Sequence, residues 1–243
     1  MNIEEEIFEI LKLLIPAFAG AFFAFLFLRF ADWGKKKKNI RDKNIRALNR
    51  IQLICNENHN FLNDSIYNID EIIKVIEEAR KRKQSPFSEN HLDKITNDKI
   101  LLLDLVNNAF VNDYFSYAIM VEKHNNDVDS INHFHESMKM ARLTGQISVE
   151  NYIENMSRFG ENIKLFKKFC SDSMDMTQDI IAKCRVQLKD ETSLWKKLFK
   201  KPIYNYDKTF NKKYAAELVL LKKELDQITN ASKERIKKVV SEK

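Results

Sequence analysis

The stretch that decides the fold is LLIPAFAGAFFAFLFL, residues Leu13–Leu28, which contains no charged side chain. A helix needs about 20 mainly apolar residues to cross the hydrocarbon core of a bilayer. Apolar residues continue on both sides of this stretch, as far as Ile7 and Trp33. The sequence therefore predicts an N-terminal transmembrane anchor over residues 1–34.

Two other interpretations of this apolar run fit its surroundings less well. A cleaved signal peptide begins with a basic leader, whereas this N-terminus carries Glu4, Glu5, Glu6 and Glu9. No small-x-small cleavage site follows the run either. The core helix of a soluble protein is rarely apolar on every side. We therefore expect a membrane span.

The charges on either side of the span predict its orientation. Lys35, Lys36, Lys37, Lys38 and Arg41 follow it closely, whereas the residues before it are acidic. The positive-inside rule then places the short N-terminus outside and the C-terminal domain in the cytoplasm. The same five residues are expected to contact anionic lipid headgroups. Contact with the phosphates of a nucleic acid or nucleotide signal is the alternative.

One side of the predicted span consists of small residues. Ala17, Gly20, Ala21 and Ala24 recur at helical spacing and form two small-xxx-small pairs, Ala17/Ala21 and Gly20/Ala24. Small side chains let two helix backbones approach closely, and close packing drives helix association in lipid. We expect self-association of the membrane helix through this face, and therefore a homo-oligomer.

The rest of the chain is predicted to be all-α, because 4 glycines and 3 prolines in 243 residues are too few for the turns of a sheet protein. Residues 35–190 are expected to form a cytoplasmic bundle of about four to five long amphipathic helices. The clearest of these carries a heptad-like, coiled-coil stripe with steps of four and three residues. Its members are Ile51, Cys55, Asn58, Leu62, Ser65, Ile69, Ile72, Ile76 and Ala79. Asn58 and Ser65 are polar, so they either set the register or face solvent where the stripe drifts.

Interruptions of the pattern predict where helices begin and end. Gln84–Asn90, which contains a proline, is expected to be the first break, and a second helix is strongest over Ile100–Val121. Asn125–Asp129 is expected to be a turn. Gly145 is expected to end the next helix as a C-cap, and Ser148 to begin another.

The tail, residues 191–243, differs in character. It begins with SLWKKLFKK, residues 193–201, a basic amphipathic stretch with aromatic residues that is typical of an interfacial membrane-binding segment. The residues expected at the interface are Trp195, Lys196, Lys197, Phe199 and Lys200. The alternative is that Trp195 packs into the bundle and the lysines face solvent. A final helix is predicted after Pro202.

No arrangement of residues predicts an enzyme or a cofactor. Isolated glycines cannot build a phosphate-binding loop. Cys55, Cys170 and Cys184 lack metal-type spacing and are expected to be small buried hydrophobic residues. His133 and His135 would point to different faces of a helix, so we expect an exposed pair and no metal site.

The stretch GAFFAFLFLRFADWGKKKK, residues 20–38, and the helix after it resemble uncharacterised bacterial single-pass inner-membrane proteins with a helical cytoplasmic domain. Some of those proteins lie among anti-phage defence genes. The resemblance covers about the first third of the chain and includes no catalytic motif. It implies a non-enzymatic oligomeric effector at the bacterial inner (plasma) membrane. Its cytoplasmic domain would sense or bind a partner and arrange the spans into a pore or disrupt the bilayer.

Two further hypotheses compete with the effector. The first is a membrane-tethered scaffold or adaptor that binds a protein partner at the inner leaflet. The second is recognition of a nucleic acid or nucleotide by the basic clusters. The span has no row of polar residues to line a pore, which counts against a water-filled channel. Membrane lipid, a second copy of the chain and a protein are thus the expected partners.

Overall fold

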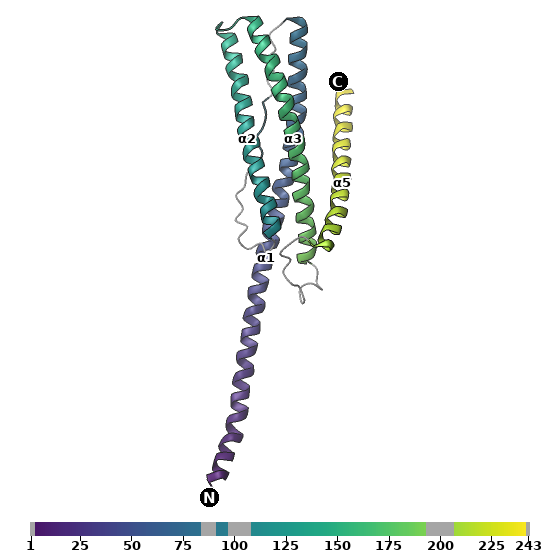
Figure 1. Ribbon diagram of the computed structural model, residues 1–243. Helices are drawn as coiled ribbons and strands as arrows, with labels where there is room; N and C mark the ends of the chain where they lie inside the picture. Colours follow the sequence, from purple (N-terminus) through teal and green to yellow (C-terminus); the bar gives the residue numbers. More distant parts are fainter. Residues whose placement is uncertain (1–2, 84–90, 97–107, 193–206, 242–243) are drawn as a thin grey trace. The chain divides into compact units, whose positions relative to one another are not determined.

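The described part of the chain is built from α-helices (Figure 1). The computed structural model describes residues 3–83, 91–96, 108–192 and 207–241, and no strand occurs within these ranges. The helices are α1 (Ile3–Arg82), α2 (Asn108–Leu143), α3 (Val149–Thr192) and α5 (Lys208–Ser241). The predicted all-α class is confirmed.

The chain divides into two compact units, Met1–Arg46 and Ala47–Lys243. α1 contributes to both units and is continuous through Gly34, where the sequence changes from apolar to basic. The described residues of the first unit all belong to α1, so that unit has no core of its own. We call the second unit the helical unit. The domain boundaries expected after residues 34 and 190 stay predictions.

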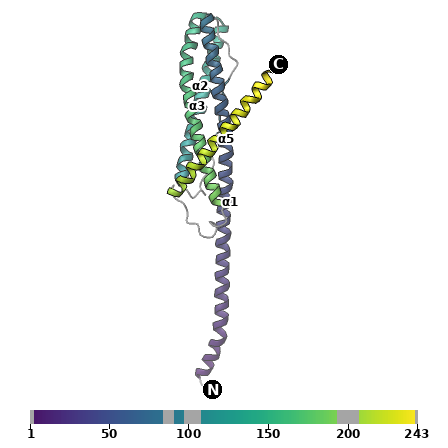
Figure 2. The same ribbon diagram turned by 90° about the vertical axis from the view of Figure 1, so that its right-hand side faces the viewer.

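The core of the helical unit lies between α2, α3 and the C-terminal part of α1, which run side by side in both views (Figures 1 and 2). All nine residues of the predicted stripe, from Ile51 to Ala79, are buried, with at most 7% of each exposed. Asn58 and Ser65 are buried with the rest. The stripe therefore does not drift towards solvent, and its polar members belong to the core.

The junction between α2 and α3 has the predicted caps. Gly145 adopts a φ of 73°, a conformation that glycine reaches without steric cost. Its N–H donates to Arg142 O, and Gln146 N–H donates to Ala141 O, which is the hydrogen-bond pattern of a Schellman motif. Ser148 Oγ accepts from Asn151 N–H at 3.2 Å and caps the start of α3.

The turn predicted at Asn125–Asp129 is wrong, because α2 is helical through all of these residues. Asn125 lies on the side of α2 that faces another part of the chain, and its amide is hydrogen-bonded to the backbone of Ile95. The polar run therefore serves a tertiary contact. The predicted break at Gln84–Asn90 lies outside the described residues, as does the start of the helix predicted over Ile100–Val121.

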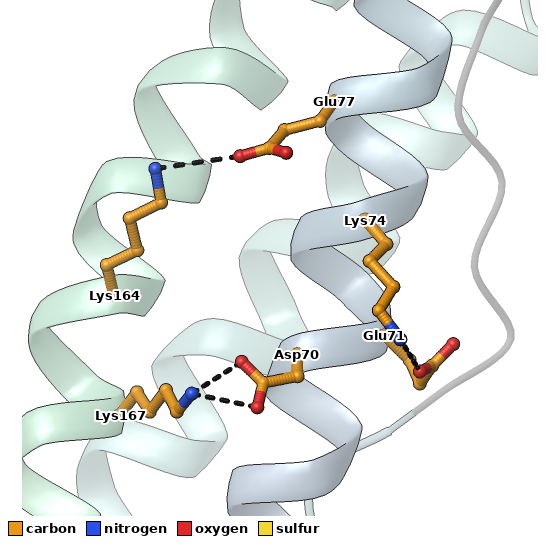
Figure 3. Close-up of polar contacts among 6 residues, drawn as sticks. All are labelled: Asp70, Glu71, Lys74, Glu77, Lys164 and Lys167. Atoms are coloured by element: carbon orange, nitrogen blue, oxygen red, sulfur yellow. Dashed lines mark hydrogen bonds and ion pairs between the residues drawn. The ribbon is translucent and has the colours of Figure 1, made fainter.

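Ion pairs join α1 to α3 along the surface of the helical unit (Figure 3). Lys167 on α3 donates to both carboxylate oxygens of Asp70 on α1, at 2.6 and 2.8 Å. Lys164 lies 3.9 Å from Glu77. Nearby, Gly160 lies against Ile76, and a Cβ added at this glycine would be 3.6 Å from the isoleucine side chain. The two helices thus combine a packed inner face with a charged rim.

α5 lies against α3 and crosses it at an angle (Figure 2). Asp207 caps its N-terminus, where Oδ1 accepts from Phe210 N–H at 2.6 Å. Phe210 and Leu221 are buried, so α5 places one apolar edge on the core. The helix predicted after Pro202 is confirmed from Lys208 onwards.

Candidate functional site

The first unit exposes a large apolar surface. Between Leu14 and Trp33, ten large hydrophobic side chains are each 54–79% exposed. They are Leu14, Ile15, Phe18, Phe22, Phe23, Phe25, Phe27, Leu28, Phe30 and Trp33. An 18-residue window of α1 has a mean hydropathy of 2.0 and none of it is buried. This helix is long and apolar enough to cross a membrane.

Aromatic and basic side chains meet at the C-terminal end of this surface. Lys37 Nζ lies 3.9 Å from the centre of the Trp33 ring, and the Arg29 guanidinium lies 5.5 Å from the Phe25 ring. These are cation–π contacts. The predicted lipid-contacting lysines, Lys35–Lys38, are all exposed. An aromatic ring next to exposed lysines is the composition found at membrane interfaces.

The predicted self-association face is open in the single chain. Gly20, Ala21 and Ala24 are exposed, and a Cβ added at Gly20 would meet nothing within 4 Å. The side chain of Ala17 lies outside the described part. Contact between two copies through this face stays a prediction.

In the helical unit, a short non-helical segment, residues 91–96, is inserted against the helices. Leu92 and Ile95 are 3% and 2% exposed and belong to the core, whereas Asp93 and Lys94 between them are exposed. Two aliphatic side chains three residues apart therefore anchor the segment.

Three asparagines hold the backbone of this segment, and we call them the asparagine clamp. Asn132 and Asn125, both on α2, each accept from and donate to one residue, Leu92 and Ile95 respectively, at 2.9–3.1 Å. Asn58 on α1 accepts from Thr96 N–H at 2.7 Å and donates to Thr96 O at 2.9 Å. Each amide thus exchanges two hydrogen bonds with one residue, as paired residues of antiparallel strands do.

The clamp has a regular spacing. Asn125 and Asn132 are seven residues apart on a helix, about 10.5 Å at 1.5 Å per residue. Leu92 and Ile95 are three residues apart, about 10 Å in an extended chain. The later asparagine binds the earlier residue of the segment, so the segment runs antiparallel to α2.

Side-chain contacts continue the same antiparallel register. Lys94 Nζ lies 2.7 Å from Asp129, and His91 Nε2 lies 3.4 Å from Glu136. Both acidic residues are on α2. These contacts are exposed and add little energy, but they follow the order set by the clamp.

The histidines do not lie as predicted. His133 is exposed, whereas His135 is 5% exposed and packs on the Phe159 ring; the expected exposed pair is wrong. His124 is fully buried against Phe166 and Phe169. Burial lowers the pKa of His124 and His135, because a charged imidazole is poorly solvated there. The aromatic rings that bury His124 and His135 lie on α3. The helical periodicity of α2 alone therefore does not show that these two histidines are buried.

The three cysteines are buried and free, as predicted. Burial raises the pKa of the Cys55 and Cys170 thiols to about 12. A thiol is nucleophilic as its thiolate, so these side chains have a packing role. No group of three or more candidate metal ligands lies close together in the described residues.

The contact between α3 and α5 is rich in charge. Glu217 on α5 is 8% exposed in its side chain and binds Lys189 at 2.5 Å and Arg185 at 3.6 Å. Lys213 on α5 pairs with Asp190 on α3 at 2.7 Å. The predicted interfacial segment before α5, with Trp195, Lys196, Lys197, Phe199 and Lys200, lies outside the described residues.

Comparison with known proteins adds no relative. No protein family model matches the chain, and neither a curated protein nor a solved structure matches it. The function is therefore inferred from the two surfaces above, the apolar surface of α1 and the clamp.

Proposed function

We propose that the chain is a non-enzymatic single-pass membrane protein that holds a helical binding unit at the inner face of the bacterial plasma membrane and assembles there through its span. The observation that carries this proposal is the apolar window of α1, none of which is buried. Burying one large apolar side chain is worth about 1.5–3 kcal/mol relative to exposing it in water. Ten such side chains between Leu14 and Trp33 favour a non-aqueous surrounding strongly.

The distribution of these side chains favours lipid over a covering protein helix. Phe22 and Phe23 are neighbours, and Phe25, Phe27 and Leu28 follow, all more than half exposed. Successive helical residues are rotated by about 100°, so these five reach every side of the axis. A protein partner would cover one stripe, whereas lipid surrounds the whole helix.

The proposed topology can be tested by labelling with a maleimide that does not cross membranes. The native cysteines are buried, so cysteines introduced at Asn2 and, separately, at the exposed Asn60 serve as reporters. With the N-terminus outside, intact cells label the first variant, and the second is labelled only after lysis. Labelling of the second variant in intact cells would overturn the topology.

Self-association is tested at Gly20. A Cβ added at this position meets nothing within 4 Å, so Gly20→Leu is expected to change the surface of the span and to leave the monomer intact. Ala19→Leu is the matched control, because position 19 lies outside the small-residue face, about 100° around the helix from Gly20 and about 140° from Ala24. We expect native mass measurement of the detergent-purified protein to show fewer copies per complex for Gly20→Leu alone. Equal assembly of both variants would remove the small-residue face from the proposal.

The same pair of variants separates an effector from a scaffold. An effector that disrupts the membrane depolarises cells on expression, and Gly20→Leu abolishes that effect while Ala19→Leu retains it. A scaffold tolerates replacement of residues 1–33 by an unrelated span of the same topology. Depolarisation that persists in Gly20→Leu would count against the effector, and loss of function on span replacement against the scaffold.

A further inference from the structure

The clamp binds the main chain of residues 91–96 rather than their side chains. Six hydrogen bonds join Asn58, Asn125 and Asn132 to the segment, and all six involve its backbone N–H and C=O groups. Any residue except proline offers these groups. The clamp is therefore indifferent to the sequence that it holds.

Selectivity arises at two positions. Leu92 and Ile95 insert into the core, while Asp93 and Lys94 face solvent. This combination of main-chain hydrogen bonds and pockets for spaced side chains is how extended peptides are recognised at sheet edges. Here the side chains of two helices replace the sheet edge.

We propose that the asparagine clamp, with the core positions that receive Leu92 and Ile95, is a binding site for an extended segment of a partner protein. The segment of this chain, residues 91–96, occupies that site in cis. The partner segment carries aliphatic side chains at positions i and i+3 and is free in sequence between them. When the partner segment replaces residues 91–96, the six main-chain hydrogen bonds are kept. The free energy of this exchange therefore depends on how well the two aliphatic side chains at positions i and i+3 fit the core.

The cis segment is a strong competitor. A covalently joined ligand has an effective concentration in the millimolar range. The intact chain is thus expected to bind a free peptide only weakly, and a chain whose own segment no longer fits is expected to bind it well. This difference measures how strongly the cis segment competes for the site.

The first experiment uses the full chain in detergent and a fluorescein-labelled peptide, ENHLDKITND, which is residues 89–98 of this chain. The double change Leu92→Asp and Ile95→Asp is designed to release residues 91–96 from the clamp, and we call this variant the vacated chain. Asp93→Asn with Lys94→Gln is the matched control, because both side chains are exposed in the same segment. Fluorescence anisotropy is expected to show at least tenfold tighter peptide binding by the vacated chain than by the control. A peptide with aspartate at both anchors is expected not to bind.

Adding Asn125→Ala and Asn132→Ala to the vacated chain removes four of the six hydrogen bonds and is expected to weaken binding a further tenfold or more. A vacated chain that keeps its helical circular dichroism but binds no peptide would overturn the proposal. So would equal binding with and without the two asparagines.

A measurement on the unaltered chain covers the case in which the vacated chain does not fold. The N–H groups of Leu92, Ile95 and Thr96 are protected by the clamp. Millimolar unlabelled peptide is expected to speed hydrogen exchange in residues 91–96 of the chain, because the peptide takes their place. Exchange that is unchanged at the highest peptide concentration would overturn the proposal.

Discussion

Two regions of α1 carry many apolar side chains but have opposite surroundings. Between Leu14 and Trp33 the large apolar side chains are more than half exposed. Between Ile51 and Ala79 the stripe residues are buried by α2, α3 and residues 91–96. One continuous helix thus carries a surface suited to lipid and a surface suited to protein.

The difference lies in how the apolar residues are distributed around the helix axis. The stripe residues return every three or four positions and occupy one side, so neighbouring helices can cover them. In the earlier region, apolar residues follow one another directly, as Phe22 and Phe23 do. The first region therefore differs from the second in two ways: it is more apolar, and its apolar residues surround the helix axis instead of forming one stripe.

The largest expected effect comes from charging each region in turn. An aspartate at the centre of a membrane helix costs about 3 kcal/mol, so Phe22→Asp with Phe25→Asp is expected to release the protein from membranes washed with carbonate. The melting of the helical unit should not change.

Ile69→Asp buries an unpaired carboxylate at a fully buried site, which costs several kcal/mol. That variant is expected to stay in the membrane and lose its cooperative unfolding transition.

The reverse outcome would break the comparison. If charging Phe22 and Phe25 lowered the melting temperature of the helical unit, the apolar surface would be a protein contact. If Ile69→Asp left the melting unchanged, the buried stripe would not form the core.

Asn58→Ala is expected to have the second largest effect. It leaves Thr96 N–H, Thr96 C=O and the Tyr117 hydroxyl without the partner that now lies within 2.9 Å of each. An unsatisfied buried polar group costs about 1–3 kcal/mol, so we expect the free energy of unfolding to fall by about 3 kcal/mol in urea titrations. Asn60→Ala, on the exposed side of the same helix, is the control and should change it by less than about 0.5 kcal/mol.

The stripe and the clamp show what the sequence predicts well and what it does not. Periodicity places all nine stripe positions correctly because each contact repeats along one helix. The clamp joins Asn125 and Asn132 on α2 to residues more than 25 positions earlier, and no local pattern encodes that pairing. Local polarity instead suggested a turn at Asn125–Asp129. The seven-residue spacing of the two asparagines is the one signal that indicates a shared helix face.

The caps and the histidines give the same lesson. Gly145 and Ser148 are predicted correctly because the hydrogen bonds of a cap close within a few residues. The burial of His124 and His135 depends on aromatic rings of α3, so it requires the tertiary arrangement. The lipid-facing role of the span and its self-association face stay predictions of the sequence.

The buried histidines predict a pH dependence of the helical unit. Burial lowers the pKa of His124 in the folded state, whereas in the unfolded chain it lies near the ordinary value of about 6.5. The unfolded state therefore binds the proton first as pH falls, and stability declines below about pH 6.5. We expect the melting temperature to fall between pH 7.5 and pH 5.5. His124→Phe should reduce this dependence, because His135 still contributes, whereas His133→Gln, at an exposed position, should leave it unchanged.

The smallest effect is expected at the rim between α1 and α3. Lys167 and Asp70 form a short ion pair, but their side chains are 37% and 44% exposed, so water screens the attraction. A double-mutant cycle with Lys167→Ala and Asp70→Ala should give a coupling of about 0.2–1 kcal/mol that shrinks in 1 M salt. The pair joins α3 to α1, the helix that carries the buried stripe. A coupling of several kcal/mol, insensitive to salt, would mean that electrostatics rather than the buried stripe aligns α1 with α3.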